Sequence, residues 1–362
     1  MKVIDIVFTV DYEIHGNGQG EFSDFCYRPT ELMLDIANVY GAKISLMAEM
    51  EHYFSMQLYP DIFYKDIRLF EAQLSRAIKE NHDVQLHLHP QWLKARYQNG
   101  RWEFPYTANE IALLCNNYEI AFERVRKSKD WLTHNLQYYN SKYECVSFRA
   151  GYFQMQPSSN ITRALIDNGI FCDTSVVKGL FRSGWNGNLD YRDIRTLNRP
   201  YRASMENVAL EDKSSPVIEF PINVVQYDII LNKFLKIFGH TKYTSDSISK
   251  IQKMKIEQLQ QHSQTTQMGY KVDTKIKKLF HPKKYRYLDF CQEDPNTILS
   301  SIKMMRCEDD RNLLVVLIAH SKDFVFSNQF KHLLEGINQI PECNYLTLRE
   351  ASRKYYELIK LH

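Results

Sequence analysis

Asp11, Glu13 and His15 alternate in the segment TVDYEIHGNG, directly after an apolar run at the amino terminus. Side chains two residues apart in extended backbone point to the same face, so these three groups can project together. Such a face can present a general base and a metal ligand side by side. A solvated loop rich in turn-forming residues is the alternative interpretation of this segment.

A pair of histidines follows another apolar run, in the segment DVQLHLHPQW. His87 and His89 are two residues apart, and Pro90 ends the extended stretch directly after them. Two imidazoles that converge at a strand end are common ligands of first-row metals. The spacing therefore predicts metal binding, whereas a single histidine would more simply be structural or exposed.

Three more polar residues each follow an apolar run: Arg149 in SFRAGYFQ, Asp173 in FCDTSV and His320 in VVLIAHSKDF. A guanidinium at a strand end usually orients a carboxylate or binds an anion. A histidine in such a position is suited to general acid–base chemistry. The alternatives are a surface ion pair for Arg149 and a buried, hydrogen-bonded imidazole for His320.

Short apolar runs alternate with longer amphipathic segments, and these elements must position the polar residues. The expected strands cover residues 3–9, 43–47, 83–88, 145–149, 171–173, 217–224, 313–319 and 345–347. The expected helices cover residues 30–39, 61–80, 108–136, 158–168 and 329–338, with a last helix at the carboxyl terminus. This alternation favours a parallel sheet, whose chemistry gathers at the carboxyl ends of its strands. Six or seven of these strands suit a barrel slightly short of eight, so we predict an α/β fold, a distorted (β/α) barrel of seven strands, with residues 1–362 in one domain.

The composition is typical of a globular protein, with 44% hydrophobic, 13% aromatic and 25% charged residues. The seven cysteines are scattered and never spaced CxxC, which argues against a disulfide scaffold and a thiolate zinc site. No segment reaches about 18 consecutive apolar residues, and the amino terminus lacks the pattern of a signal peptide. We therefore expect a soluble, cytoplasmic protein.

A basic segment at residues 233–286 interrupts the strand–helix pattern. It carries twelve Lys and one Arg against three acidic residues, a net charge of +10, which leaves −7 for the rest of a chain whose total is +3. A solvated insertion, helical or mobile, is the usual interpretation. The alternative is a platform for an anionic membrane surface or a lipid-linked glycan, which would place the protein at the inner membrane face. No nucleic-acid motif accompanies the charge, so we expect no nucleic-acid partner; the sequence does not indicate the oligomeric state.

Taken in order, these motifs resemble those of the polysaccharide deacetylases of carbohydrate esterase family 4, over nearly the whole chain. The family's opening TFDDG motif is similar to TVDYEIHG, so Asp11 matches its catalytic base. Tyr12 stands where the family has a metal-binding aspartate, and Glu13 is the expected substitute.

The histidine motif of the family is similar to LHLHPQW. His87 matches the first metal ligand, whereas Gln91 stands at the position of the second. His89 is the expected replacement, so the resemblance implies that Glu13, His87 and His89 hold a divalent metal, which we expect to be zinc.

The Arg-x-Pro-Tyr motif of the family resembles RAGY at residues 149–152, with the proline lost. The resemblance implies that Arg149 tethers Asp11 and that the backbone N–H of Tyr152 helps to hold an oxyanion. His320 matches the family's catalytic histidine, and Asp173 matches the aspartate that orients it.

The resemblance implies a metal-dependent hydrolase that removes an acetyl group from an N-acetylated sugar of a polysaccharide or surface-glycan precursor. Asp11 would take a proton from the attacking water, and His320 would protonate the departing amine. Another metal-dependent C–N or glycan hydrolase on the same barrel, and a catalytically silent carbohydrate-binding homologue, are the alternatives. Aromatic side chains that could stack on a sugar, or pack in the core instead, are Trp92, Trp102, Tyr152 and Trp185.

Overall fold

The computed structural model describes residues 3–184, 187–194, 198–228, 283–308 and 312–360. The expected basic insertion at residues 233–286 therefore lies almost entirely outside the described residues. The chain divides into two units, residues 1–225 with 287–362 and residues 226–286. All of the elements that carry the site described below belong to the first unit.

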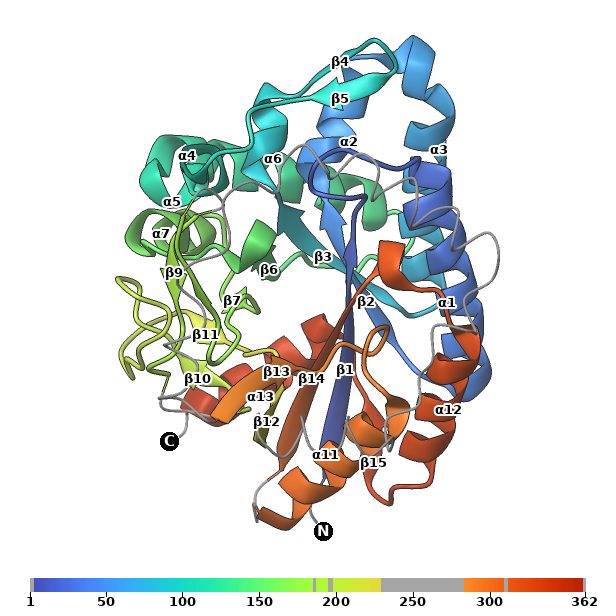
Figure 1. Ribbon diagram of the computed structural model, residues 1–362, viewed down its shortest axis with the longest axis vertical. Coiled ribbons are helices and arrows are strands. Elements are labelled where there is room, and N and C mark those ends of the chain that lie inside the picture. Colours follow the sequence, from blue (N-terminus) through green and yellow to red (C-terminus); the bar gives the residue numbers. More distant parts are fainter. Residues whose placement is uncertain (1–2, 185–186, 195–197, 229–282, 309–311, 361–362) are drawn as a thin grey trace. The chain divides into compact units, whose positions relative to one another are not determined.

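A mainly parallel sheet forms the centre of the first unit (Figure 1). Its strand order is β10-β11-β7-β6-β3-β2-β1-β14, and β15 also pairs with β1. Neighbouring strands of this sheet run parallel among the described residues, except β10 with β11. The strands are β1 (Ile4–Tyr12), β2 (Ile44–Glu49), β3 (Asp83–Leu88), β6 (Ser147–Ala150), β7 (Cys172–Asp173), β10 (Tyr201–Arg202), β11 (Ile218–Glu219), β14 (Leu313–His320) and β15 (Cys343–Tyr345).

Among the described residues, three two-stranded sheets lie outside this main sheet. They are formed by β4 (Arg96–Gln98) with β5 (Arg101–Glu103), β8 (Phe181–Arg182) with β9 (Leu189–Asp190), and β12 (Val224–Asp228) with β13 (Lys283–Tyr287).

Helices follow the strands, and α1 and α12 lie along one side of the sheet in Figure 1. None of the described helices combines the length and apolar character needed to cross a membrane. The helices are α1 (Arg28–Tyr40), α2 (Met50–Gln57), α3 (Pro60–Lys79), α4 (Ala108–Ile111), α5 (Leu113–Asn116), α6 (Tyr118–Leu136), α7 (Ser159–Asp167), α11 (Pro295–Glu308), α12 (Ser327–Asn338) and α13 (Leu348–Lys360).

The α/β fold with a parallel sheet is confirmed, although several boundaries differ from the sequence prediction. The helix expected at residues 108–136 is broken into α4, α5 and α6, and the strand expected at residues 345–347 lies at Cys343–Tyr345. Of the helices in the described part of the chain, α2 and α11 were not predicted. All but one of the residues of α2 are buried, so it lacks the polar face on which a helical period depends.

The sheet curls, because its two ends are joined by hydrogen bonds. Asn223, which follows β11, donates its backbone N–H to the carbonyl of Val316 in β14 at 3.0 Å. The side-chain oxygen of Asn223 accepts the N–H of Val316 at 2.8 Å. One face of the sheet is therefore concave, and we call it the inner face.

Alternation along each strand decides which side chains reach the inner face. In β1, Val7 packs in the inner apolar cluster, and Thr9 and Asp11 share its face, whereas Phe8 and Val10 pack in the outer core. The inner apolar cluster consists of Val7, Met47, Cys172, Ile218, Phe220, Leu314 and Val316 together with Leu348, Ala351 and Tyr355 of α13.

Helix α13 fills the inner face at the amino ends of the strands. Asp5 at the start of β1 accepts hydrogen bonds from Lys354 at 2.6 Å and from Tyr355 at 2.9 Å. Ser45 of β2 accepts the backbone N–H of Leu348 at 2.8 Å. With this end occupied, the opposite end of the inner face is where a ligand could reach the polar side chains of the strands.

Candidate active site

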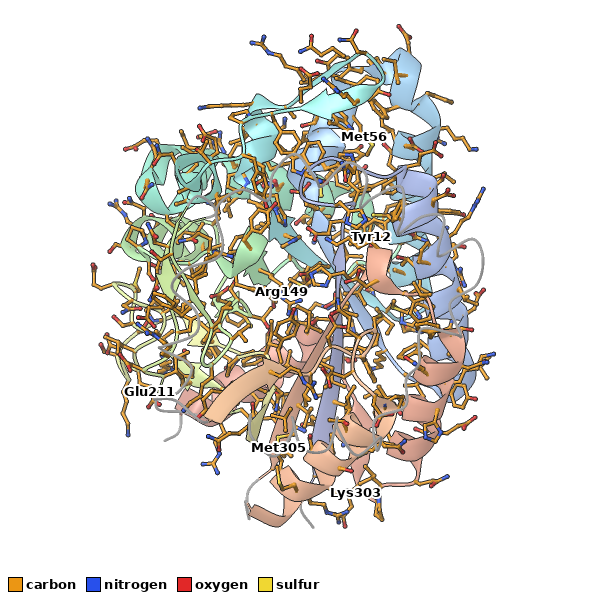
Figure 2. All side chains as sticks on the ribbon, in the orientation of Figure 1. Tyr12, Met56, Arg149, Glu211, Lys303 and Met305 are labelled. Carbon is orange, nitrogen blue, oxygen red and sulfur yellow. The ribbon has the colours of Figure 1, made fainter. Side chains whose placement is uncertain are left out.

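Four strands bring their predicted polar residues to the carboxyl end of the inner face. Asp11 in β1 pairs in register with His320 in β14, and His87 in β3 pairs with Arg149 in β6. In Figure 2, Arg149 lies on the inner side of β1 and Tyr12 on the opposite side. Residues that are more than 300 positions apart in the sequence thus meet at one site.

Glu13, His87 and His89 form a compact cluster. The Oε2 atom of Glu13 lies 3.1 Å from Nε2 of His87 and 2.7 Å from Nε2 of His89. All three residues are buried. The Nδ1 atom of His87 lies 2.8 Å from the backbone carbonyl of Arg149, and a hydrogen bond there leaves the Nε2 lone pair free to face Glu13.

This cluster fits a divalent cation by its donor chemistry. Two imidazoles and one carboxylate are a common ligand set for zinc in catalytic sites, and their donor atoms lie within 4.8 Å of one another. Burial lowers the pKa of His89, which favours the neutral imidazole that a metal requires. Burial would also lower the pKa of His87, but Asp11 and Glu13 leave it raised overall. Gln91 stands where the polysaccharide deacetylases have their second metal-binding histidine. Its side-chain amide nitrogen lies 3.1 Å from Nδ1 of His89.

Lys322 is a member of the site that the sequence analysis missed. Its ammonium lies 2.5 Å from Oε1 of Glu13. Burial alone would raise the pKa of Glu13, but Lys322 and His89 hold it well below the usual value. Lys322 follows the predicted His320 by two residues in HSKDF, so its proximity to the strand end was the available signal.

Arg149 tethers Asp11, as the resemblance implied. Its Nη1 donates to Oδ1 of Asp11 at 2.6 Å. Its other nitrogens donate to the carbonyl of Thr174 at 3.0 Å and to the hydroxyl groups of Thr9 at 2.9 Å and Thr174 at 3.2 Å. Burial would raise the pKa of Asp11, but the guanidinium leaves it lowered overall, so Asp11 is held as a carboxylate.

His320 lies between Asp11 and two carboxylates that the sequence analysis did not assign. Its Nε2 is 3.5 Å from Oδ2 of Asp11. Its Nδ1 is 3.8 Å from Oδ2 of Asp289 and 3.7 Å from Oδ2 of Asp323. Burial would lower the pKa of His320, but Asp289 and Asp11 raise it above the usual value.

Asp173 does not lie beside His320, which corrects the expectation that it orients this histidine. It pairs in register with Phe148 and Glu219, and Phe148 packs in the outer core. Its neighbour Cys172 packs in the inner cluster. Alternation therefore turns Asp173 to the outer face, where its Oδ1 accepts a hydrogen bond from Ser175 at 2.6 Å.

Tyr152 lies beside the cluster of Glu13, His87 and His89, which we call the metal-type cluster. Its backbone conformation is unusual for a non-glycine residue. Its φ and ψ angles are 55° and 19°, and such left-handed residues are enriched at functional sites. Its ring contacts the ring of His89 with centroids 4.6 Å apart, and its hydroxyl accepts a hydrogen bond from Gln91 at 3.1 Å. A Cβ at Gly16 would lie 2.0 Å from this hydroxyl, so the loop after β1 closes tightly over Tyr152.

Trp92 does not offer a face to a sugar, in contrast to the expectation that it binds substrate. It is 3% exposed, and its ring packs against His52, Trp102 and Phe104 with centroid distances of 4.5, 5.2 and 4.9 Å. Trp102 belongs to the same buried aromatic cluster. Trp185 lies outside the described residues.

Solved structures that are similar to this chain over nearly its whole length include two proteins assigned to the polysaccharide deacetylases and an allantoinase. A protein from Mycobacterium smegmatis assigned to that class has a TM-score of 0.48 and 10% identity, over 99% of this chain and 91% of its own. A protein from Pseudomonas aeruginosa, also assigned to that class, has a TM-score of 0.47 and 9% identity, over 100% and 93%. The Puue allantoinase has a TM-score of 0.46 and 10% identity, over 99% and 92%.

No protein-family model matches the sequence, and a search of curated proteins found no match. With identities near 10% and TM-scores below 0.5, the function of this chain has to be inferred from its own residues.

Proposed function

We propose that this protein is a metal-dependent hydrolase that removes an acetyl group from an N-acetylated sugar. The observation that carries the proposal is the meeting of two groups of residues at one end of the inner face. Glu13, His87 and His89 form a metal-type cluster, and the Asp11–Arg149 ion pair lies beside it. A substrate and water held at the metal-type cluster would lie next to the carboxylate of Asp11.

Glu13, His87 and His89 would hold the cation, for which we propose zinc. A divalent cation at such a site polarises a carbonyl oxygen and lowers the pKa of water. Arg149 keeps Asp11 ionised and fixes one of its oxygens, which leaves the other, Oδ2, to accept a proton from the attacking water. The ion pair with Lys322 keeps the Glu13 side chain ionised and oriented.

The second half of the reaction requires a proton for the departing sugar amine. We propose that His320 supplies it, because its Nε2 faces Oδ2 of Asp11 at 3.5 Å and its pKa is raised. The backbone N–H of Tyr152 would help to stabilise the oxyanion, an interaction typically worth about 3–4 kcal/mol.

The remaining parts of the proposal concern the whole chain. We propose that the parallel strands form a distorted barrel of seven strands in a single domain. We also propose that the basic segment at residues 233–286 is an insertion that contacts an anionic membrane surface or a lipid-linked glycan, in a cytoplasmic protein that acts on a surface-glycan precursor.

Acetate release from N-acetylglucosamine oligomers, measured with zinc-loaded protein, tests the reaction. We expect Asp11→Asn to abolish release while it leaves the zinc content unchanged, because Asp11 is not among the proposed ligands. His87→Ala should lose the zinc, as measured by elemental analysis. His134→Ala, on the exposed face of α6, should retain both the zinc content and acetate release. Full activity of Asp11→Asn would exclude this residue as the base.

A catalytically silent carbohydrate-binding protein is the second candidate, and Lys322 is the observation that favours it. The ammonium already supplies a positive charge to Glu13, so the carboxylate does not depend on a metal for charge compensation. Glycan binding by a protein that takes up no zinc and releases no acetate would select this candidate over the first.

A further inference from the structure

Asp289, His320 and Asp323 form a second cluster with metal-ligand chemistry, next to the proposed active site. Their donor atoms lie within 4.8 Å of one another. The cluster shares no residue with Glu13, His87 and His89. His320 separates the two regions, because its Nε2 faces Asp11 whereas its Nδ1 faces Asp289 and Asp323.

Two donor atoms of this cluster are buried and have no hydrogen-bond partner among the described residues. They are Oδ2 of Asp289 and Nδ1 of His320. Asp289 is 1% exposed, and leaving a buried polar atom unpaired costs about 1–3 kcal/mol. The 3.8 Å between these two atoms is too long for a hydrogen bond. Both atoms therefore lack a partner that a bound ion would supply.

The two carboxylates are held in place by their other contacts. Oδ1 of Asp289 accepts the backbone N–H groups of Cys291 at 2.8 Å and of Gln292 at 3.2 Å. The side-chain amide of Gln292 donates to Oδ2 of Asp323 at 2.7 Å. Supporting hydrogen bonds of this kind orient ligands in metal sites, and here one residue, Gln292, contacts both carboxylates.

The spacing within the cluster suits a shared ion better than a direct ion pair. Charge-assisted N–H···O bonds are about 2.7–2.9 Å long, whereas Nδ1 of His320 lies 3.7 and 3.8 Å from the two carboxylate oxygens. Two donor atoms that each lie about 2.0–2.2 Å from one zinc ion are separated by roughly 3–4 Å. A single cation can thus contact the three side chains with little movement.

We propose that Asp289, His320 and Asp323 form a second, inhibitory site for a divalent first-row cation such as Zn²⁺. The inhibitory role rests on the proposed function, in which His320 is the proton donor. An imidazole whose Nδ1 lone pair binds a cation cannot carry protons on both ring nitrogens. It therefore cannot act as the imidazolium acid, and the leaving amine receives no proton.

A calorimetric Zn²⁺ titration of the full-length protein at neutral pH, with elemental analysis, tests the site. We expect two equivalents of Zn²⁺ for the wild type. Asp289→Asn should weaken the second equivalent at least tenfold and leave the first unchanged. Asp323→Ala should do the same and is safer for folding, because the Asp323 side chain is 29% exposed. Asp294→Asn is the matched control: the Asp294 carboxylate accepts the N–H of Thr297 at the start of α11, a role that asparagine fills equally well.

The inhibitory role is tested by the ratio of acetate release at excess Zn²⁺ to that at one equivalent. This ratio should be well below one for the wild type and return towards one for Asp323→Ala. A single equivalent of Zn²⁺ in the wild type that both variants retain, or two unchanged equivalents in both variants, would overturn the second site. Two equivalents that respond to the variants, with no acetate release at any Zn²⁺ concentration, would uphold the site and reject the proposed function.

Discussion

At the scale of single residues, Arg149 determines the state of the proposed base. It is fully buried, and its guanidinium donates to Asp11, Thr9 and both oxygens of Thr174. A lysine would keep the positive charge but could not reproduce four hydrogen bonds from one planar group. Each buried acceptor left without a donor costs about 1–3 kcal/mol.

We therefore predict that Arg149→Lys lowers the free energy of unfolding by about 2–4 kcal/mol, as measured by urea denaturation. Acetate release should fall as well, because Asp11 would no longer be fixed. The same substitution at Arg126, whose side chain is 52% exposed and pairs with Glu123, should change the stability by less than about 0.5 kcal/mol. Equal stability of the two lysine variants would show that the buried guanidinium is replaceable.

At the scale of elements, strand alternation explains which site residues could be predicted from the sequence. Asp11, His87 and Arg149 follow apolar runs long enough to fix the face on which each side chain lies. Asp173 is the second residue of a strand of only two residues, Cys172–Asp173, which is too short for its face to be read from the apolar pattern. The sequence therefore placed this carboxylate at the correct level of the sheet but not on the correct face.

The residues that the sequence analysis missed lie in turns. Lys322 and Asp323 lie in the 3-10 turn after β14, and Asp289 forms a single β-bridge with Ile318 of β14 and begins the turn that leads to α11. Turn residues carry no period, so their direction depends on contacts that form only in the folded chain. These residues complete both clusters of possible metal ligands. Lys322 pairs with Glu13 at the first cluster, and Asp289 and Asp323 lie beside His320 in the second.

The turn after β6 provides a prediction at this scale. Gly151 stands where the Arg-x-Pro-Tyr motif of the polysaccharide deacetylases has its proline. A Cβ at Gly151 would lie 2.7 Å from Cγ of His89 and 2.8 Å from the carbonyl oxygen of Leu88. Because the carbonyl belongs to a buried strand, the imidazole would have to move. We predict that Gly151→Ala weakens Zn²⁺ binding at the first site at least tenfold in a calorimetric titration and destabilises the fold by about 1–3 kcal/mol.

Gly336→Ala is the control for this effect. A Cβ at Gly336 would lie 2.3 Å from the flexible end of Leu299, away from the site residues. This variant should be destabilised but should bind Zn²⁺ with unchanged affinity. If Gly151→Ala also bound Zn²⁺ normally, the position of His89 would not depend on the absence of a side chain at residue 151.

At the scale of the whole molecule, buried carboxyl groups couple folding to pH. Asp173 and Glu219 face each other on neighbouring strands and are both fully buried. Burial raises the pKa of Asp173 to about 6 and that of Glu219 well above its usual value. The folded protein therefore keeps protons that the unfolded chain releases near pH values of about 4.

From about pH 4 to about pH 6, the folded state binds more protons at this pair than the unfolded state, so the pair's contribution to stability falls as the pH rises. Asp173→Asn removes one of these protons, and its amide can donate to Glu219 at any pH. We predict that between about pH 4.5 and pH 7 the variant loses less stability than the wild type, by on the order of 2 kcal/mol in urea denaturation. Asp130→Asn on the exposed face of α6 should follow the wild-type curve. A curve for Asp173→Asn that runs parallel to the wild type would mean that Asp173 is already ionised in the folded protein.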